Sequence, residues 1–179
     1  FFYEKAWKIN PCSQPVAFRL ARIYQKTEEY EKSIERCYSI LSVDSLNTKF
    51  IKQAAFSYFK WEKYQQSKHL WAKILEIGDT TTFVIKYLGI SEMNCRDFHV
   101  GRKHLLMAYE RDTSDFEICF YLGRAYLNSM EKEKGLDFLR KANALIQPKP
   151  KVLTAISQEK ATILNALHRY REAIVEHKK

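Results

Sequence analysis

The chain has 179 residues, of which 46% are hydrophobic and 28% are charged, and its formal net charge at pH 7 is +9. This much apolar material excludes a disordered chain. Only five glycines and four prolines are present, and no long stretch alternates apolar with polar residues, which excludes an all-β protein. No apolar run reaches the roughly 18 residues that a membrane-spanning helix needs. We therefore expect a folded, all-α protein with no membrane span in this chain.

A pair of residues that ends in a small side chain recurs every 34 residues, at Leu20-Ala21, Ala54-Ala55, Leu88-Gly89 and Leu122-Gly123. A second small position recurs at the same interval, at Ser33, Ser67, Gly101 and Gly135. A period of this length is typical of stacked helix pairs. Because only small side chains let two helices cross closely, the two series predict one crossing point on each helix of a pair.

This period divides the chain into successive segments. Residues 1–13 correspond to the closing half of a repeat, and four full repeats follow, each with room for two helices of three to four turns, at 14–47, 48–81, 82–115 and 116–149. The spacing between successive small-residue positions then lengthens to 38 residues, because a proline-containing insertion lies at 147–151. Residues 150–179 form a final partial repeat. Since proline cannot continue a helix, we expect a joint or bend at the insertion, within one array over 1–179.

At each of two further positions, three of the four repeats have an aromatic residue. A tyrosine follows the first small position by three residues, at Tyr24, Tyr58 and Tyr126, and an aromatic residue begins the second helix, at Tyr30, Tyr64 and Phe98. This pattern resembles the tetratricopeptide repeat over nearly the whole chain. The resemblance implies a right-handed superhelical solenoid of antiparallel helix pairs, whose neighbours bury one another's apolar faces. Both end segments resemble incomplete repeats, so we expect an excerpt of a longer array or disordered ends.

The resemblance also implies which side chains line the concave side of the array. In tetratricopeptide arrays the first helix of each pair faces this groove through its fifth and ninth positions, and a spacing of four residues places both on one helical face. The predicted partner-binding residues are therefore Phe18, Arg22, Lys52, Phe56, Lys86, Ile90, Phe120 and Arg124. One turn further along lie Lys26, Lys60, Asn94 and Asn128.

Basic and apolar groups alternate at these positions, which favours an extended peptide with acidic and apolar side chains as the partner. The alternative is that the cations are simply solvated on the surface of a basic protein. The family's carboxylate clamp, a lysine followed four residues later by asparagine, is not matched, because Phe56 follows Lys52 and Ile90 follows Lys86. We therefore do not expect the C-terminal tail of a chaperone as the ligand.

Two other functions stay open. Incomplete end repeats would let the chain act as a structural spacer that self-associates end to end. A helical repeat that binds nucleic acid would need a continuous basic stripe. Here six Lys and Arg face three Asp and Glu in 48–81, but five face five in 14–47 and in 82–115, and this uneven distribution argues against nucleic acid.

The sequence contains no recognisable catalytic motif. No serine or cysteine lies in the context of a catalytic triad, and no glycine-rich phosphate loop is present, so we expect neither enzymatic activity nor a cofactor. The densest group of potential metal ligands comprises Cys95, Asp97, His99 and His104. Their spacing matches no common metal motif, so we interpret them as turn residues exposed to solvent and predict no metal site.

The four cysteines, Cys12, Cys37, Cys95 and Cys119, fall at unrelated places in the repeat and form no CxxC pair. This pattern predicts free thiols rather than disulfides or a zinc site. Cys37 takes the position of Trp71, Leu105 and Leu139 in later repeats, which indicates a place in the core. Free thiols favour a reducing compartment, cytoplasmic rather than periplasmic.

Overall fold

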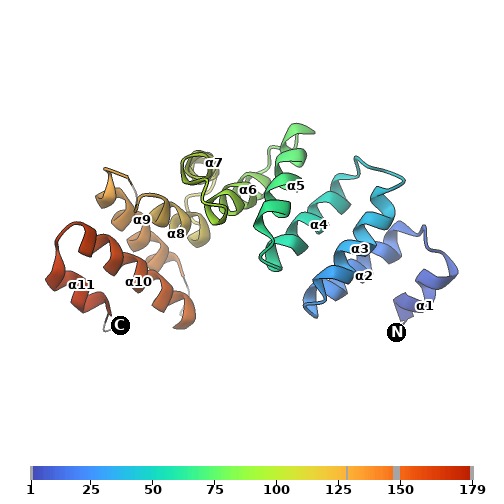
Figure 1. Cartoon of the computed structure of the whole chain (residues 1–179), viewed down its shortest axis with the longest axis horizontal. Helices are drawn as coiled ribbons and strands as arrows, with labels where there is room; N and C mark the ends of the chain where they lie inside the picture. The colour runs from blue at the N-terminus through green and yellow to red at the C-terminus, as the bar shows by residue number, and fades with distance from the viewer. Residues whose placement is uncertain (1, 128, 147–149, 178–179) are drawn as a thin grey trace. The chain divides into compact units, whose positions relative to one another are not determined.

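The computed structural model describes residues 2–127, 129–146 and 150–177, and every regular element in these ranges is an α-helix (Figure 1). The first helices are α1 (Phe2–Ile9), α2 (Gln14–Lys26), α3 (Tyr30–Leu41), α4 (Thr48–Lys60), α5 (Tyr64–Glu76) and α6 (Thr82–Asn94). They are followed by α7 (Phe98–Arg111), α8 (Phe116–Ala125), α9 (Lys132–Leu145), α10 (Pro150–Ala166) and α11 (Tyr170–His177). The predicted aromatic starts of the second helices, Tyr30, Tyr64 and Phe98, are the first residues of α3, α5 and α7.

The helices form two compact units, unit 1 (Phe1–Cys95) and unit 2 (Arg96–Lys179). Within unit 1, each helix from α1 to α6 contacts the next one along the chain, and α2 also contacts α4. Within unit 2, each helix from α7 to α11 contacts the next, and α8 also contacts α10. The boundary between the units falls inside the predicted repeat 82–115, between its two helices, and the single array over 1–179 stays a prediction.

The insertion that lengthens the fourth spacing lies largely outside the described residues, because 147–149 are not among them. The predicted joint or bend falls there. The following helix, α10, begins at Pro150. Proline is favoured in the first turn of a helix because the missing N–H group would have no intrahelical partner there.

The connections before α3, α5, α7 and α11 repeat one backbone conformation. Glu28, Glu62, Arg96 and His168 all have positive φ angles, of 63°, 59°, 67° and 60°. Each lies two residues before the second helix of a pair, at α3, α5, α7 and α11. The left-handed region is uncommon for residues other than glycine, and these four turns adopt it with three different residue types, Glu, Arg and His.

Buried hydroxyl groups link three helices at the predicted crossings of unit 1. The Ser33 hydroxyl of α3 donates a hydrogen bond to the Ala21 carbonyl oxygen of α2 at 2.7 Å, and it lies 2.8 Å from the Ser57 hydroxyl of α4. The same arrangement recurs one repeat later, at Ser67, Ala55 and Ser91. The small residues of this unit therefore permit close approach and also satisfy buried polar groups between successive pairs.

At the crossing of α8 and α9 in unit 2, glycine occupies the small-residue positions. An ideal Cβ atom on Gly135 would lie 3.0 Å from the carbonyl oxygen of Gly123 and 3.0 Å from Cδ1 of Ile163, a residue of α10. A side chain at this point would therefore have to displace its neighbours on α8 and α10. Unit 2 uses the same crossing positions as unit 1, but without the hydroxyl links.

The core follows the same repeat. Trp71 and Ile74 of α5, Ile51 of α4 and Leu139 of α9 are at most 1% exposed. Cys37 and Cys119 are also fully buried, and all four cysteines are free. Burial raises the pKa of the Cys37 thiol to about 12, as expected for a cysteine that packs as a small hydrophobic side chain.

Candidate functional site

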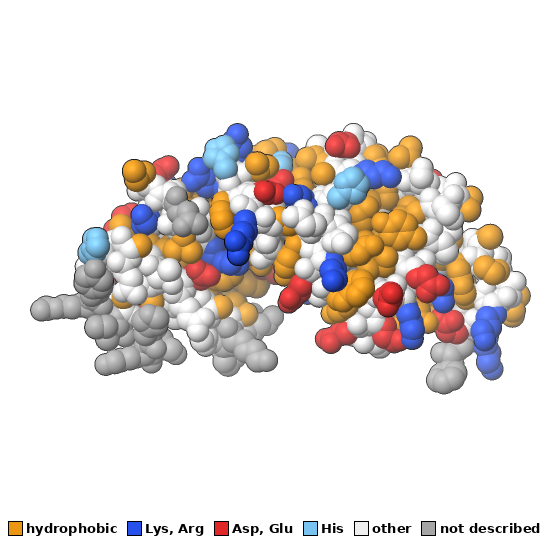
Figure 2. Space-filling view, viewed as in Figure 1, with side chains coloured by type: hydrophobic (Ala, Val, Ile, Leu, Met, Phe, Trp, Pro, Cys, Tyr) orange, Lys and Arg blue, Asp and Glu red, His pale blue; other side chains and the backbone are white. Residues whose placement is uncertain are grey.

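The eight predicted partner-binding residues all lie on the first helices of their pairs. Six belong to unit 1, on α2, α4 and α6, and two belong to unit 2, on α8. We call the surface of unit 1 that these three helices contribute the α2–α4–α6 face. On the visible side of unit 1, hydrophobic side chains gather over α4, with basic and acidic side chains at their margin (Figure 2).

On α2, Phe18 is half-buried and is surrounded by cations. Its ring meets the Phe50 ring edge to face, with 5.8 Å between centroids. The Lys49 Nζ atom lies 4.1 Å from the centroid of Phe18, and the Arg22 guanidinium lies 6.0 Å from it. Because a cation near an aromatic ring is attracted to its negative face, these contacts position the basic groups over the apolar surface.

On α4, Phe56 is the centre of an aromatic cluster. Its ring lies 5.0 Å from Tyr87 and 6.1 Å from Phe83, both of α6, and stacks on Phe59 at 6.2 Å. The Lys60 Nζ atom lies 5.5 Å from the Phe56 centroid. Phe83 remains 47% exposed, so the cluster offers aromatic surface to solvent as well as rigidity.

A cavity of about 480 Å³ opens between α2 and α4. We call it the α2–α4 cavity, and it is lined by Arg22, Gln25, Lys26, Glu28, Tyr30, Gln53, Phe56 and Lys60. The Gln53 Nε2 atom donates a hydrogen bond to Gln25 Oε1 at 2.6 Å and so connects the two helices across the cavity. The structure thus brings two predicted residues, Arg22 and Phe56, to one cavity.

Lys52 and Arg124 have carboxylate partners inside their own units. Lys52 forms an ion pair with Asp79. The hydrogen bond that Lys52 donates in this pair holds the pKa of the Asp79 carboxyl below its usual value. The Arg124 Nε atom lies 3.0 Å from Glu159 Oε1 of α10. Burial raises the pKa of the Glu159 carboxyl, and Arg124 opposes that rise. A partner carboxylate would have to compete with these internal ion pairs.

The remaining predicted positions differ in exposure. Lys86 is half-buried, with its Nζ atom 5.4 Å from the Tyr87 ring centroid. Ile90 is fully buried and therefore has no surface for a partner, so we assign it to the core. In unit 2, Phe120 is half-buried and meets the Tyr121 ring edge to face at 5.4 Å.

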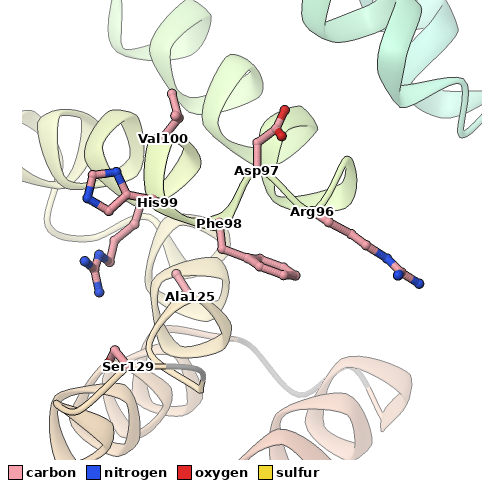
Figure 3. A pocket seen from close by; sticks show the side chains of 8 residues that line it. Arg96, Asp97, Phe98, His99, Val100, Ala125 and Ser129 are labelled. Carbon is pink, nitrogen blue, oxygen red and sulfur yellow. The ribbon is translucent and has the colours of Figure 1, made fainter.

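Unit 2 contains a second cavity, of about 630 Å³, where the start of α7 faces the end of α8. Figure 3 shows that Arg96 and His99 point to opposite sides of Phe98, with Ala125 and Ser129 across the space. The Arg96 and His99 side chains therefore do not converge on one anion position. Among the described residues, no group of three or more His, Cys, Asp or Glu side chains is arranged to bind a metal ion.

No family model and no curated protein sequence matches the chain. Solved structures do. YrrB, described as a TPR protein with an unusual peptide-binding site, has 18% identity and a TM-score of 0.74, over 98% of this chain and 88% of YrrB. MamA from Desulfovibrio magneticus RS-1 has 12% identity and a TM-score of 0.79, over 93% of both chains. MamA from AMB-1 has 16% identity and a TM-score of 0.72, over 92% of this chain and 88% of that one.

These similarities establish the fold. The predicted class, an all-α solenoid of antiparallel helix pairs of the tetratricopeptide type, is confirmed. Of the helices in the described ranges, none is both long and apolar enough to cross a membrane. Identities of 12% to 18% show a shared fold and carry no ligand from one chain to another.

Proposed function

We propose that the α2–α4–α6 face binds an extended segment of a protein partner with acidic and apolar side chains, and that the chain is an interaction scaffold rather than an enzyme. The observation that carries this proposal is the α2–α4 cavity, where Arg22, Lys26 and Lys60 surround a wall that includes Phe56. Buried aromatic groups supply most of the affinity in such complexes, and charges govern orientation and association rate. The unusual peptide-binding site of YrrB, a structure with the same fold, supports a peptide as the partner.

The proposed contact set is narrower than the sequence pattern. Phe18, Arg22 and Phe56 stay in it. Lys26 and Lys60 are added because they line the α2–α4 cavity together with Arg22 and Phe56. Lys52 and Arg124 contribute less than the pattern implies, since each is already paired with a carboxylate. The same pairing interrupts any basic stripe and argues against nucleic acid.

Selection from a random peptide library displayed on phage, followed by affinity measurement on synthetic peptides, tests this proposal. We expect the selected peptides to be enriched in Asp or Glu next to Leu or Phe. Replacing Arg22 with glutamate should weaken their binding by about tenfold or more, because a charge-assisted contact becomes repulsive.

Arg19→Glu is the matched control for this experiment. Arg19 is exposed, lies on the same helix and does not line the cavity, so the same charge reversal should change affinity by less than about twofold. Equal losses in Arg22→Glu and Arg19→Glu would mean that binding depends on net charge and not on this face. Selected peptides without acidic residues would also contradict the proposal.

A second candidate, a spacer that self-associates, is favoured by exposed apolar side chains on α1. Phe2 is 78% exposed and Ile9 is 86% exposed. If these side chains pack against a second copy, sedimentation velocity should show dimers. The double substitution Phe2→Ser and Ile9→Ser should then lower the association constant of the dimer at least about fivefold. This candidate would be excluded if the protein stayed monomeric up to about 100-fold above the concentration used in the peptide-binding measurements. Dimers that the double substitution leaves unchanged would also exclude it.

A further inference from the structure

The α2–α4 cavity carries an excess of positive charge. Arg22, Lys26 and Lys60 line it together with a single acidic residue, Glu28, so the cavity has two more cations than anions. In the described part of the chain, none of the three cations lies within ion-pair distance of a carboxylate. The excess positive charge is therefore not neutralised by internal ion pairs and is available to a ligand.

Two other cations on first helices are neutralised by carboxylates. Arg124 occupies the position equivalent to Arg22 three repeats later, and it is paired with Glu159. Lys52 is paired with Asp79. Because like charges that converge without a counterion destabilise a folded protein, this concentration of unpaired cations at one cavity calls for a ligand that compensates it.

Two of the three cations lie over aromatic rings. The Arg22 guanidinium lies 6.0 Å from the Phe18 centroid, and the Lys60 Nζ atom lies 5.5 Å from the centroid of Phe56, which lines the cavity. The Gln53 amide nitrogen is directed to Gln25, and both amides line the cavity. A cavity of about 480 Å³ is within the usual range for small-molecule sites and can admit a modified side chain.

We propose that the α2–α4 cavity binds the phosphate group of a phosphorylated side chain on the peptide partner. A phosphomonoester carries a charge of about −1.5 to −2 at pH 7 and three strong acceptor oxygens. That charge matches the excess of two cations in the cavity, whereas one carboxylate would leave one cation uncompensated. Arginine is suited to bidentate contact with phosphate, and lysine adds a point charge. This inference rests on the proposed function, because it names the chemistry of the same partner.

Titrations with small probes test the inference without knowledge of the partner. The probes are N-acetyl-O-phosphoserine amide, N-acetylglutamate amide and inorganic phosphate, each added to ¹⁵N-labelled protein at constant ionic strength and pH 7.5. We expect phosphoserine amide to bind at least about tenfold more tightly than the glutamate probe, with amide shifts at α2 and α4. Inorganic phosphate should shift the same amides.

Neutral substitutions locate the site. Arg22→Gln and Lys60→Gln should each weaken phosphoserine amide binding by about five- to tenfold. Arg19→Gln and Lys63→Gln remove the same charges from exposed positions that do not line the cavity, and they should change binding by less than about twofold. Circular dichroism of each variant checks that the fold is retained.

The outcomes separate this inference from the proposed function. Equal affinity for the phosphoserine and glutamate probes would overturn the phosphate inference, and selected acidic peptides that still depend on Arg22 would leave the proposed function intact. Equal losses in the cavity variants and in their controls would also overturn it, because binding would then reflect net charge alone. Phosphoserine binding at the cavity with no peptide selected by the face would support the phosphate site and would overturn binding of an unphosphorylated acidic segment, because displayed peptides carry no phosphate group.

Discussion

Replacing Gly123 with alanine should lower the free energy of unfolding of unit 2 by about 1–3 kcal/mol, which is typical of an overpacked core. An ideal Cβ atom at this position would lie 2.5 Å from Leu139 Cγ and 2.6 Å from Leu139 Cδ2. Leu139 is fully buried, so it cannot move aside without displacing its own neighbours. Alanine favours a helix over glycine by about 1 kcal/mol, and the observed loss is what remains after this gain. Urea denaturation followed by circular dichroism measures it.

A compensating substitution tests whether the contact with Leu139 is the cause. Three repeats earlier, the equivalent positions are occupied by Ala21 and Cys37, both fully buried. The double variant Gly123→Ala and Leu139→Cys copies that pair. We expect it to lose less stability than the sum of the two single variants, since the shorter side chain leaves room for the added methyl group. Strict additivity would show that Leu139 does not oppose the Cβ atom.

The sequence predicts the helix pairs well because their packing repeats. Each pair meets the same constraint at its crossing, so a small residue is needed at the same two positions every 34 residues, and Gly123 and Gly135 lie at that crossing in unit 2. The aromatic residues that begin second helices follow the same rule, as Tyr30 and Tyr64 do at α3 and α5. Because the packing constraint repeats along the structure, the residue pattern repeats along the sequence, and it can be recognised before the structure is known.

The candidate site is less predictable because its charges do not repeat. Asp79, the partner of Lys52, lies in the connection before α6, and its position is occupied by Ser45 one repeat earlier and by Thr113 one repeat later. Glu159, the partner of Arg124, follows the irregular insertion. The repeat pattern gives the same prediction for cations at equivalent positions. Only their neighbours in the structure show which of these cations are paired with a carboxylate.

Burial is a second reason why the register fails at one position. Helix α6 is buried on nearly all sides, including Val84, Ile85, Leu88 and Met93, in contrast to the one-sided burial of α2. Ile90 has the same helical position as Arg22, but its surroundings place it in the core. A helix that is apolar all round gives no sequence signal for which face reaches solvent.

Replacing Trp71 with alanine should lower the free energy of unfolding of unit 1 by about 3–5 kcal/mol, the usual cost of truncating a buried aromatic side chain. Trp71 is fully buried, and its ring stacks on Tyr87 at 5.7 Å and meets Phe83 edge to face at 5.6 Å. The alanine variant would leave a cavity between α5 and α6. Hydrogen exchange should show the loss of protection first in Phe1–Cys95.

Two further substitutions make this prediction sharper. Trp71→Leu introduces the residue found at the equivalent positions 105 and 139, and it also removes the indole Nε1 group, which is buried without a hydrogen-bond partner. Because an unsatisfied buried donor is unfavourable, leucine should recover at least half of the stability that alanine loses. Trp61→Ala, at a position 38% exposed, should cost less than about 1 kcal/mol. A loss at Trp61 as large as that at Trp71 would mean that ring area, and not the repeated core position, determines the stability of unit 1.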